Sequence, residues 1–274
     1  MSHFIKPAFH CLDLGTKEAV SALAKYVGVA KPPKQLAEQG TYWHHSGQPG
    51  VIADLKDRRL PPLVPEEFAR RAESKVLTNG KDKEVLLRLQ VAVATTVLGS
   101  VREMSFAGLG WGDEDAALLA KALPMCGQLL SLDLVHNPFG GDGAQQLAAA
   151  VRDTPSLANV SGIPLKELRG DSLTTLDLKS KQLGILEAMV IADLLRSVCG
   201  SVTELNLFNN LIKDEGVTAI CEALQSNKQT KLATLNVCGT GMGPAGAKAV
   251  AAMAAVVASV TTVWIPLDPM NRHP

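Results

Sequence analysis

Residues 202–224 read VTELNLFNNLIKDEGVTAICEAL, and this stretch decides the fold. Its spaced residues follow the pattern L-x-L-x-x-N-x-I and are Leu205, Leu207, Asn210 and Ile212. A helix-like run from Gly216 to Leu224 follows at once. Because related stretches recur before and after it, we expect a chain built from repeats of one strand and one helix.

Each repeat can be compared with a pattern that has apolar residues at positions 1, 4, 6 and 11 and Asn at position 9. Six full units fit this scheme, and their first residues are Val101, Leu129, Leu173, Val202, Leu232 and Val260. A seventh, starting at Leu157, has a repeat-like opening, but its KELRGD stretch is too short for a normal helix. We therefore predict a short unit there, with a gap in the layer of helices.

The pattern also predicts which side chains are buried. Side chains alternate along a strand, so positions 4 and 6 point inward while positions 3, 5 and 7 point outward. The amide of an Asn at position 9 can satisfy backbone groups in the turn. Asn137 and Asn210 occupy that position, so the turns without it are predicted to be less well tied; their position-9 residues are Leu109, Lys181, Thr240 and Asp268.

From about Lys83 to Met270, the pattern resembles leucine-rich repeats of the ribonuclease-inhibitor type, which also occur in NOD-like receptors and Ran GTPase-activating proteins. The resemblance implies an α/β solenoid with a curved parallel sheet inside and α-helices outside. Neighbouring units would then contact one another, and the strand faces would form a concave surface.

Two regions are expected. Residues 1–79 show no repeat and form a non-repeat extension, partly extended chain, with an aromatic pair at Tyr42 and Trp43. Pro65, followed by two glutamates, is typical of a helix start, and this helix is expected to reach Leu77. Residues 80–274 form the repeat domain, in which an apolar helix over 83–98 is expected to cap the array.

Composition excludes several classes of protein. The formal net charge is zero, which gives no overall field to attract nucleic acid or an anionic membrane. The N-terminus lacks the apolar core and cleavage site of a secretory signal, and the five scattered cysteines are typical of reduced thiols. Residues 243–265 are apolar enough to resemble a membrane span, but their apolar residues fall at the positions expected for a repeat, which favours a repeat unit. We expect an intracellular protein, most simply cytoplasmic, although an organelle stays open, without membrane insertion.

The sequence shows none of the common catalytic motifs. No G-x-x-x-x-G-K-[ST], G-x-S-x-G or H-E-x-x-H occurs, and the histidines have no metal-ligand spacing. We therefore expect no enzyme activity, cofactor, metal or small-molecule substrate.

The leading hypothesis is a non-catalytic protein-binding module or scaffold subunit of a larger assembly, with one or more protein partners. It would bind through the concave face and the N-terminal extension, because aromatic anchors in a polar surround are typical of protein interfaces. The candidate residues are Glu103, Asp133, Val135, Asp177, Lys179, Glu204, Asn206, Phe208, Asn236 and Trp264 on the strands, with Tyr42 and Trp43 in the extension.

Plainer interpretations and two further functions stay open. The polar residues can simply face water, and Trp264 can cover the end of the array. Resemblance alone suggests a GTPase-activating protein of the Ran regulator type, for which Arg102 is the nearest arginine to a rim position, or a sensor fragment of the NOD-like receptor type.

Overall fold

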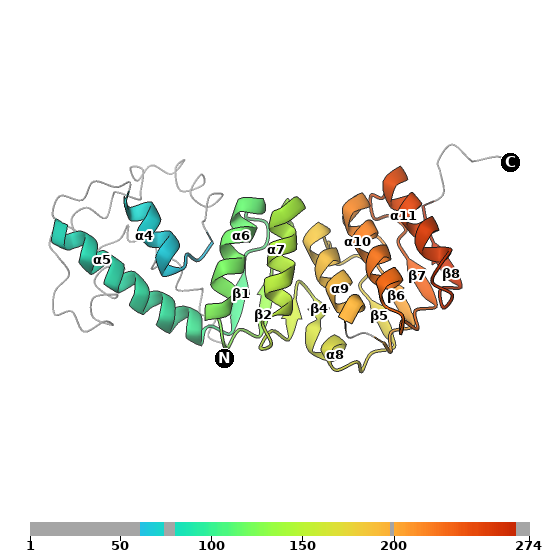
Figure 1. Cartoon of the computed structure of the whole chain (residues 1–274), viewed down its shortest axis with the longest axis horizontal. Coiled ribbons are helices and arrows are strands. Elements are labelled where there is room, and N and C mark those ends of the chain that lie inside the picture. The colour runs from blue at the N-terminus through green and yellow to red at the C-terminus, as the bar shows by residue number, and fades with distance from the viewer. Residues whose placement is uncertain (1–60, 74–79, 198–199, 267–274) are drawn as a thin grey trace. The chain divides into compact units, whose positions relative to one another are not determined.

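The computed structural model describes residues 61–73, 80–197 and 200–266, which Figure 1 draws in colour. These residues fall into two compact units. One comprises the described residues up to 101 together with 121–128, and the other comprises 102–120 together with the described residues from 129 on.

The first unit contains helices α4 (Pro65–Glu73) and α5 (Gly80–Val93), which contact each other. The predicted start of α4 at Pro65 is confirmed. Glu67 accepts hydrogen bonds from the Arg70 and Arg71 guanidinium groups at 2.6 and 3.0 Å, and these bonds lower the pKa of its carboxyl to about 2.

The helix expected over 83–98 is α5 followed by one π-helical turn, η2 (Ala94–Leu98). It lies in the first unit, and its role as a cap stays a prediction. A short 3-10 helix, η3 (Leu123–Met125), also belongs to this unit and precedes the buried Cys126. Burial raises the pKa of the Cys126 thiol to about 12, as expected for a reduced structural cysteine. Cys199, which fills the same slot of a later repeat, lies outside the described residues.

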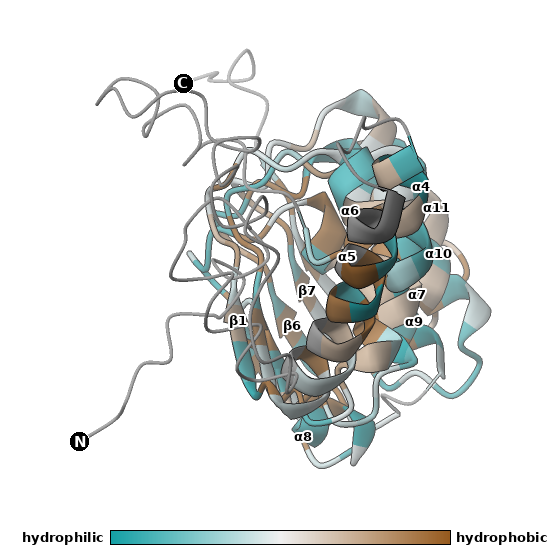
Figure 2. Cartoon of the chain, turned by 90° about the vertical axis from the view of Figure 1, so that its left-hand side faces the viewer, coloured by the Kyte–Doolittle hydropathy of each residue, from teal (hydrophilic) through white to brown (hydrophobic). Residues whose placement is uncertain are grey.

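The second unit contains the repeats. Its strands are β1 (Glu103–Ser105), β2 (Ser131–Asp133), β3 (Asn159–Val160), β4 (Ile163–Pro164), β5 (Thr175–Asp177), β6 (Glu204–Asn206), β7 (Thr234–Asn236) and β8 (Thr262–Trp264). Its helices are α6 (Asp113–Ala122, whose last two residues belong to the first unit), α7 (Gly141–Arg152), α8 (Leu165–Arg169), α9 (Ile185–Ser197), α10 (Lys213–Ser226) and α11 (Pro244–Ala254). Strands and helices form two layers of this unit, which Figure 2 shows from one end.

The predicted alternation of burial is confirmed in every full unit except the last, where Val263 is half-buried and Ile265 is exposed. Parallel pairing joins equivalent positions, so Leu176, Leu205 and Leu235 are register partners in successive strands. These three side chains, at position 4, are buried against the helices. The core is therefore a stack of aliphatic rungs, each rung supplied by one repeat.

The Asn side chains bridge neighbouring units, which corrects one prediction. Asn210 accepts the N–H groups of Lys181 and Leu183 of the preceding unit at 3.1 and 3.0 Å. It donates to the carbonyls of Leu178 and Leu207, both at 2.9 Å. The prediction that the Lys181 turn is less well tied is therefore wrong, because the following unit supplies the amide.

Asn137 repeats this arrangement one sheet earlier. It accepts the N–H groups of Leu109 and Trp111 and donates to the carbonyls of Phe106 and Leu134. The Leu109 turn is thus also tied, against the prediction. Thr240 replaces Asn with a hydroxyl that reaches the Val237 carbonyl alone, at 2.8 Å.

The short unit is confirmed, and it interrupts the sheet. The chain runs along β3 parallel to β2, turns at Ser161 and Gly162 with φ values of 51° and 85°, and returns antiparallel as β4. Positive φ at both turn residues is the type I′ hairpin geometry. The expected continuous parallel sheet is therefore two four-stranded sheets, β1–β4 and β5–β8.

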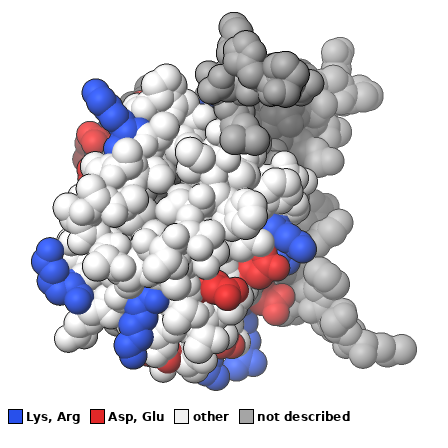
Figure 3. Space-filling view, turned by 90° about the vertical axis from the view of Figure 1, so that its right-hand side faces the viewer, with Lys and Arg blue, Asp and Glu red and all other residues white. Residues whose placement is uncertain are grey.

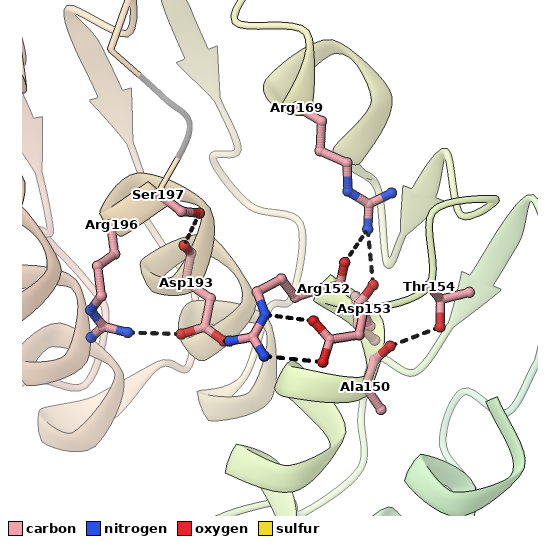
Figure 4. A network of polar contacts seen from close by, with 9 residues as sticks. Ala150, Arg152, Asp153, Thr154, Arg169, Asp193, Arg196 and Ser197 are labelled. Atoms are coloured by element: carbon pink, nitrogen blue, oxygen red, sulfur yellow. Dashed lines mark hydrogen bonds and ion pairs between the residues drawn. The ribbon is translucent and has the colours of Figure 1, made fainter. Parts of the chain in front are cut away.

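The predicted gap in the helix layer is wrong, because α7 packs directly against α9. The five-residue α8 takes no place between them, but its Arg169 donates to the carbonyls of Val151 and Leu157 at 2.9 and 2.7 Å. Arg169 also donates to the Arg152 carbonyl at 3.3 Å (Figure 4). On the same side, Asp193 of α9 pairs with Arg152 at 3.6 Å. The short unit thus closes the C-terminal end of α7 with a side chain instead of a full helix.

A buried polar pair replaces the backbone pairing at this interruption. In regular units the N–H at position 6 donates to a carbonyl of the next strand, as Phe106 does to Asp133 at 2.8 Å. Leu134 instead donates to the Ser161 hydroxyl, at 3.1 Å, and Ser161 donates to Glu187 at 2.9 Å. Glu187, which is 2% exposed, also accepts the Gly184 N–H at 2.8 Å.

Candidate protein-binding face

The outward residues at positions 3, 5 and 7 of the units make up one side of the sheets, which we call the strand face. The interruption divides the predicted site residues into two groups. Glu103, Asp133 and Val135 lie on or directly after β1 and β2. The second sheet and the residues after its strands hold Asp177, Lys179, Glu204, Asn206, Phe208, Asn236 and Trp264. Tyr42 and Trp43 lie outside the described residues.

Most of the predicted strand residues are open to solvent. Glu103, Asp177, Lys179, Glu204, Phe208 and Trp264 are exposed, while Asp133, Val135, Asn206 and Asn236 are half-buried. The two aromatic side chains are 45% and 58% exposed at Phe208 and Trp264. The second sheet therefore carries both large apolar groups of the predicted site.

The side chains at position 5 hold the ends of the strands. Asp177, Asn206 and Asn236 each accept the N–H of the residue two places on, at 3.2, 3.1 and 3.1 Å. Asp133 does the same toward Val135 at 3.4 Å. This local bond is the Asx turn, so these residues fix the backbone at position 7 in addition to facing outward.

This geometry positions Phe208 firmly. Its N–H donates to the Asn206 side chain, and its carbonyl accepts the Ser180 N–H at 2.9 Å. Asn206 in turn donates to Asp177 at 3.0 Å across the strands. The Phe208 backbone is thus tied to the Asn206 side chain and to the residues that follow β5.

Strand register fixes the relation between the aromatic residues. Asn206 is the register partner of Asn236, and Asn236 is the partner of Trp264. Phe208 follows two residues after Asn206 on the same face. Trp264 and Phe208 therefore lie two strands apart, with Asn236 and Cys238 of the strand between them.

The structure also shows features that the repeat pattern did not indicate. The residue at position 8 has a positive φ in five units, at Gly108, His136, Ser180, Asn209 and Gly239. His136 contacts Gln182 across the interruption, with Nε2 and Oε1 2.6 Å apart. Among these five residues, the two glycines are the ones whose residue type most clearly indicates a left-handed backbone.

The last unit differs from the others at its core positions. Ile265, at position 6, is 45% exposed, whereas Leu207 and Val237 at the same position are fully buried. On α11 the exposed residues are mostly Ala, and Lys248 is its single charge. Much of the surface on this side of the molecule accordingly bears no charge (Figure 3).

Among the described residues, no group of three or more His, Cys, Asp or Glu side chains could hold a metal ion. Within the same residues, no helix is long and apolar enough to cross a bilayer. Arg102, considered as a rim arginine, directly precedes β1 and is exposed, and its carbonyl accepts the Leu130 and Ser131 N–H groups.

Comparison with known families supports the repeat assignment. A family model described as leucine-rich repeat matches residues 129–148 and 198–221, one stretch in each sheet region. No curated protein matches the chain. These two stretches are therefore similar to leucine-rich repeats, a motif that generally mediates contacts between proteins.

Proposed function

We propose that this protein is a non-catalytic interaction module or scaffold subunit whose repeats form a solenoid of the ribonuclease-inhibitor type. Its strand face, which we expect to be concave, binds a protein partner. One observation carries the proposal: Phe208 and Trp264 are exposed on a face whose backbone is fixed by the position-5 side chains. A rigid aromatic anchor loses little conformational entropy on binding.

The surroundings of the anchors fit an interface. Hot-spot residues of protein interfaces are typically aromatic and lie within a rim of polar groups. Asn206 and Asn236 supply such groups beside Phe208. The N-terminal extension, with Tyr42 and Trp43, is proposed as a second contact.

Co-purification of partners with the tagged full chain tests the proposal. Phe208→Ala combined with Trp264→Ala is expected to lower the recovery of specific partners at least about tenfold, since truncating a hot spot costs more than about 1.4 kcal/mol. The matched control removes two apolar side chains that are at least as exposed and lie outside the predicted site, Leu211→Ala with Val256→Ala.

Equal recovery from both double variants would refute binding through the strand face. A separate variant, Tyr42→Ala with Trp43→Ala, tests the extension. If it keeps every partner while the strand-face variant loses them, binding is confined to the repeats.

A further inference from the structure

The outward rows of the strand face differ in charge. Positions 3 and 5 hold four carboxylates and no base, and these are Glu103, Asp133, Asp177 and Glu204. Position 7 holds one charge, Lys179, among apolar residues, and the row reads Ala107, Val135, Lys179, Phe208, Cys238 and Pro266. Over both sheets, one positive and four negative charges leave three net negative charges. On the second sheet, Asp177 and Glu204 against Lys179 leave one net negative charge, in a chain whose formal net charge is zero.

On the second sheet, the acidic groups lie beside the aromatic anchor. Glu204 and Asn206 lie on the outward side of β6, and Phe208 follows two residues later on the same side. Asp177, on the neighbouring strand β5, is the register partner of Asn206. The Asp177 carboxylate is held by the Lys179 N–H and the Asn206 amide, at 3.2 and 3.0 Å. Neither Asp177 nor Glu204 forms an ion pair within the described residues, so both charges are available to a partner.

The two kinds of row run across the strands, side by side. Positions 3 and 5 of β5 to β8 are register partners, so these two rows cross all four strands. The position-7 residues follow two places after each position-5 residue and form a parallel row just beyond the strand ends. Strands about 4.8 Å apart give a row roughly 14 Å long. A helix rises 1.5 Å per residue, so about ten helical residues would follow such a row.

We propose that the strand face of the second sheet takes a cationic amphipathic helix of a protein partner, lying across the strands. Its apolar side would pack on the position-7 row around Phe208, and its basic side would face Asp177 and Glu204. This inference rests on the proposed function and adds the chemistry of the partner. Negative charge on the face disfavours nucleic acid and anionic lipid as occupants.

A labelled peptide probe tests this chemistry. The probe is an amphipathic helix of about 18 residues made of Leu and Lys, and its matched control carries Glu at every Lys position. Fluorescence anisotropy with the full chain should show binding of the Lys peptide, weakened by added salt, and no binding of the Glu peptide. Equal binding of both peptides, or no binding of the Lys peptide up to about 1 mM, would overturn the proposal.

Variants locate the bound peptide. Phe208→Ala should weaken the Lys peptide about tenfold, and Asp177→Asn with Glu204→Gln several-fold with a smaller salt dependence. Lys179→Ala should strengthen binding about twofold, because a like charge is removed. Leu211→Ala and Glu222→Gln, exposed outside this face, serve as matched controls. If all variants bind alike, the peptide binds elsewhere and the proposal fails.

The failure of this inference can be told from failure of the proposed function. Suppose that native partners depend on Phe208 and Trp264 in co-purification but the Lys peptide does not bind. This result would support the proposed interaction module and reject the cationic helix as its ligand.

Discussion

The regular turn at Asn210 and the interruption at Glu187 solve the same problem in different ways. In both places the backbone leaves a parallel strand, and polar groups inside the protein need partners. The regular turn uses one amide that makes five main-chain hydrogen bonds. The interruption uses a hydroxyl and a carboxylate, Ser161 and Glu187, which make a chain of three bonds.

The difference lies in charge as well as number. Asn210 is neutral, so burial costs it only the hydrogen bonds with water, and these are replaced. Burial raises the pKa of the Glu187 carboxyl above its ordinary value of 4.5, although the Gly184 and Ser161 bonds oppose this shift. The Ser161–Glu187 pair thus lets a repeat be cut short at this point. Its hydrogen bonds depend on the protonation state of the Glu187 carboxyl, whereas those of the neutral Asn210 amide do not.

Removal of the regular amide should have the largest effect on stability. Asn210→Ala leaves the N–H groups of Lys181 and Leu183 and two carbonyls without their partner in a buried turn. We expect the free energy of unfolding to fall by about 3–4 kcal/mol, since each unsatisfied buried group costs roughly 1–3 kcal/mol and water offsets part of the loss. Urea unfolding followed by circular dichroism measures it.

Asn236→Ala is the matched control for that change. Its side chain makes one local bond, to the Cys238 N–H, and is half-buried. Its loss should cost about 1 kcal/mol or less. Similar losses for the two variants would show that the turn amide is not a special support of the repeat.

Removal of the charged group at the interruption should have a smaller effect. Glu187→Ala leaves the Ser161 hydroxyl and the Gly184 N–H without an acceptor, but it also removes a buried charge. We expect a loss of about 2 kcal/mol at neutral pH in the same unfolding measurement. Glu187→Gln keeps an acceptor oxygen and should stay near the wild type, and a loss as large as that of the Ala variant would contradict the hydrogen-bond account.

Much of the regular part could be read from the sequence, and the interruption could not. The apolar positions 4 and 6 predicted the buried rungs. The close approach of α10 to α9 at Gly216, where a Cβ would lie 2.6 Å from that of Ala188, needed the structure. The Asn pattern predicts an amide that satisfies its own turn, and this holds for its bond to the Leu207 carbonyl, but the N–H groups that it accepts belong to the turn of the preceding unit. The pattern shows which residue recurs within a unit, whereas the amide bonds also reach the unit before it.

The misread parts depend on contacts between units. The short KELRGD stretch predicted that a full helix is missing, but it did not predict that α7 packs directly on α9. Protein interiors are closely packed, so the neighbouring helices fill the space that a short unit leaves. Ser161 and Glu187 are 26 residues apart, and neither residue type signals a buried pair. On the strand face, alternation alone indicated which residues face outward, while the bonds that fix Phe208 needed the register.

The pH dependence of stability gives the finest test of the difference between Asn210 and Glu187. The folded-state pKa of Glu187 is raised, so the folded protein binds more protons than the unfolded chain as pH rises above about 4.5. Its contribution to stability is therefore full below the unfolded pKa and is lost as pH rises through the folded pKa. The free energy of unfolding of Glu187→Gln, minus that of the wild type, should be constant at acidic pH and increase toward neutral pH. Asn210→Ala minus wild type should instead change little across the same range.

Glu67 supplies a control of opposite sign. Arg70 and Arg71 lower the pKa of its carboxyl to about 2, so its contribution is present above the ordinary value of 4.5 and is lost as pH falls toward 2. The advantage of the wild type over Glu67→Gln should accordingly shrink only below about pH 4.5, in a window separate from that of Glu187. Urea unfolding at a series of pH values measures both differences. If the Glu187→Gln difference were the same at every pH, the carboxyl would have equal pKa values in the folded and unfolded states, and the interruption would be as insensitive to protonation as the Asn turn.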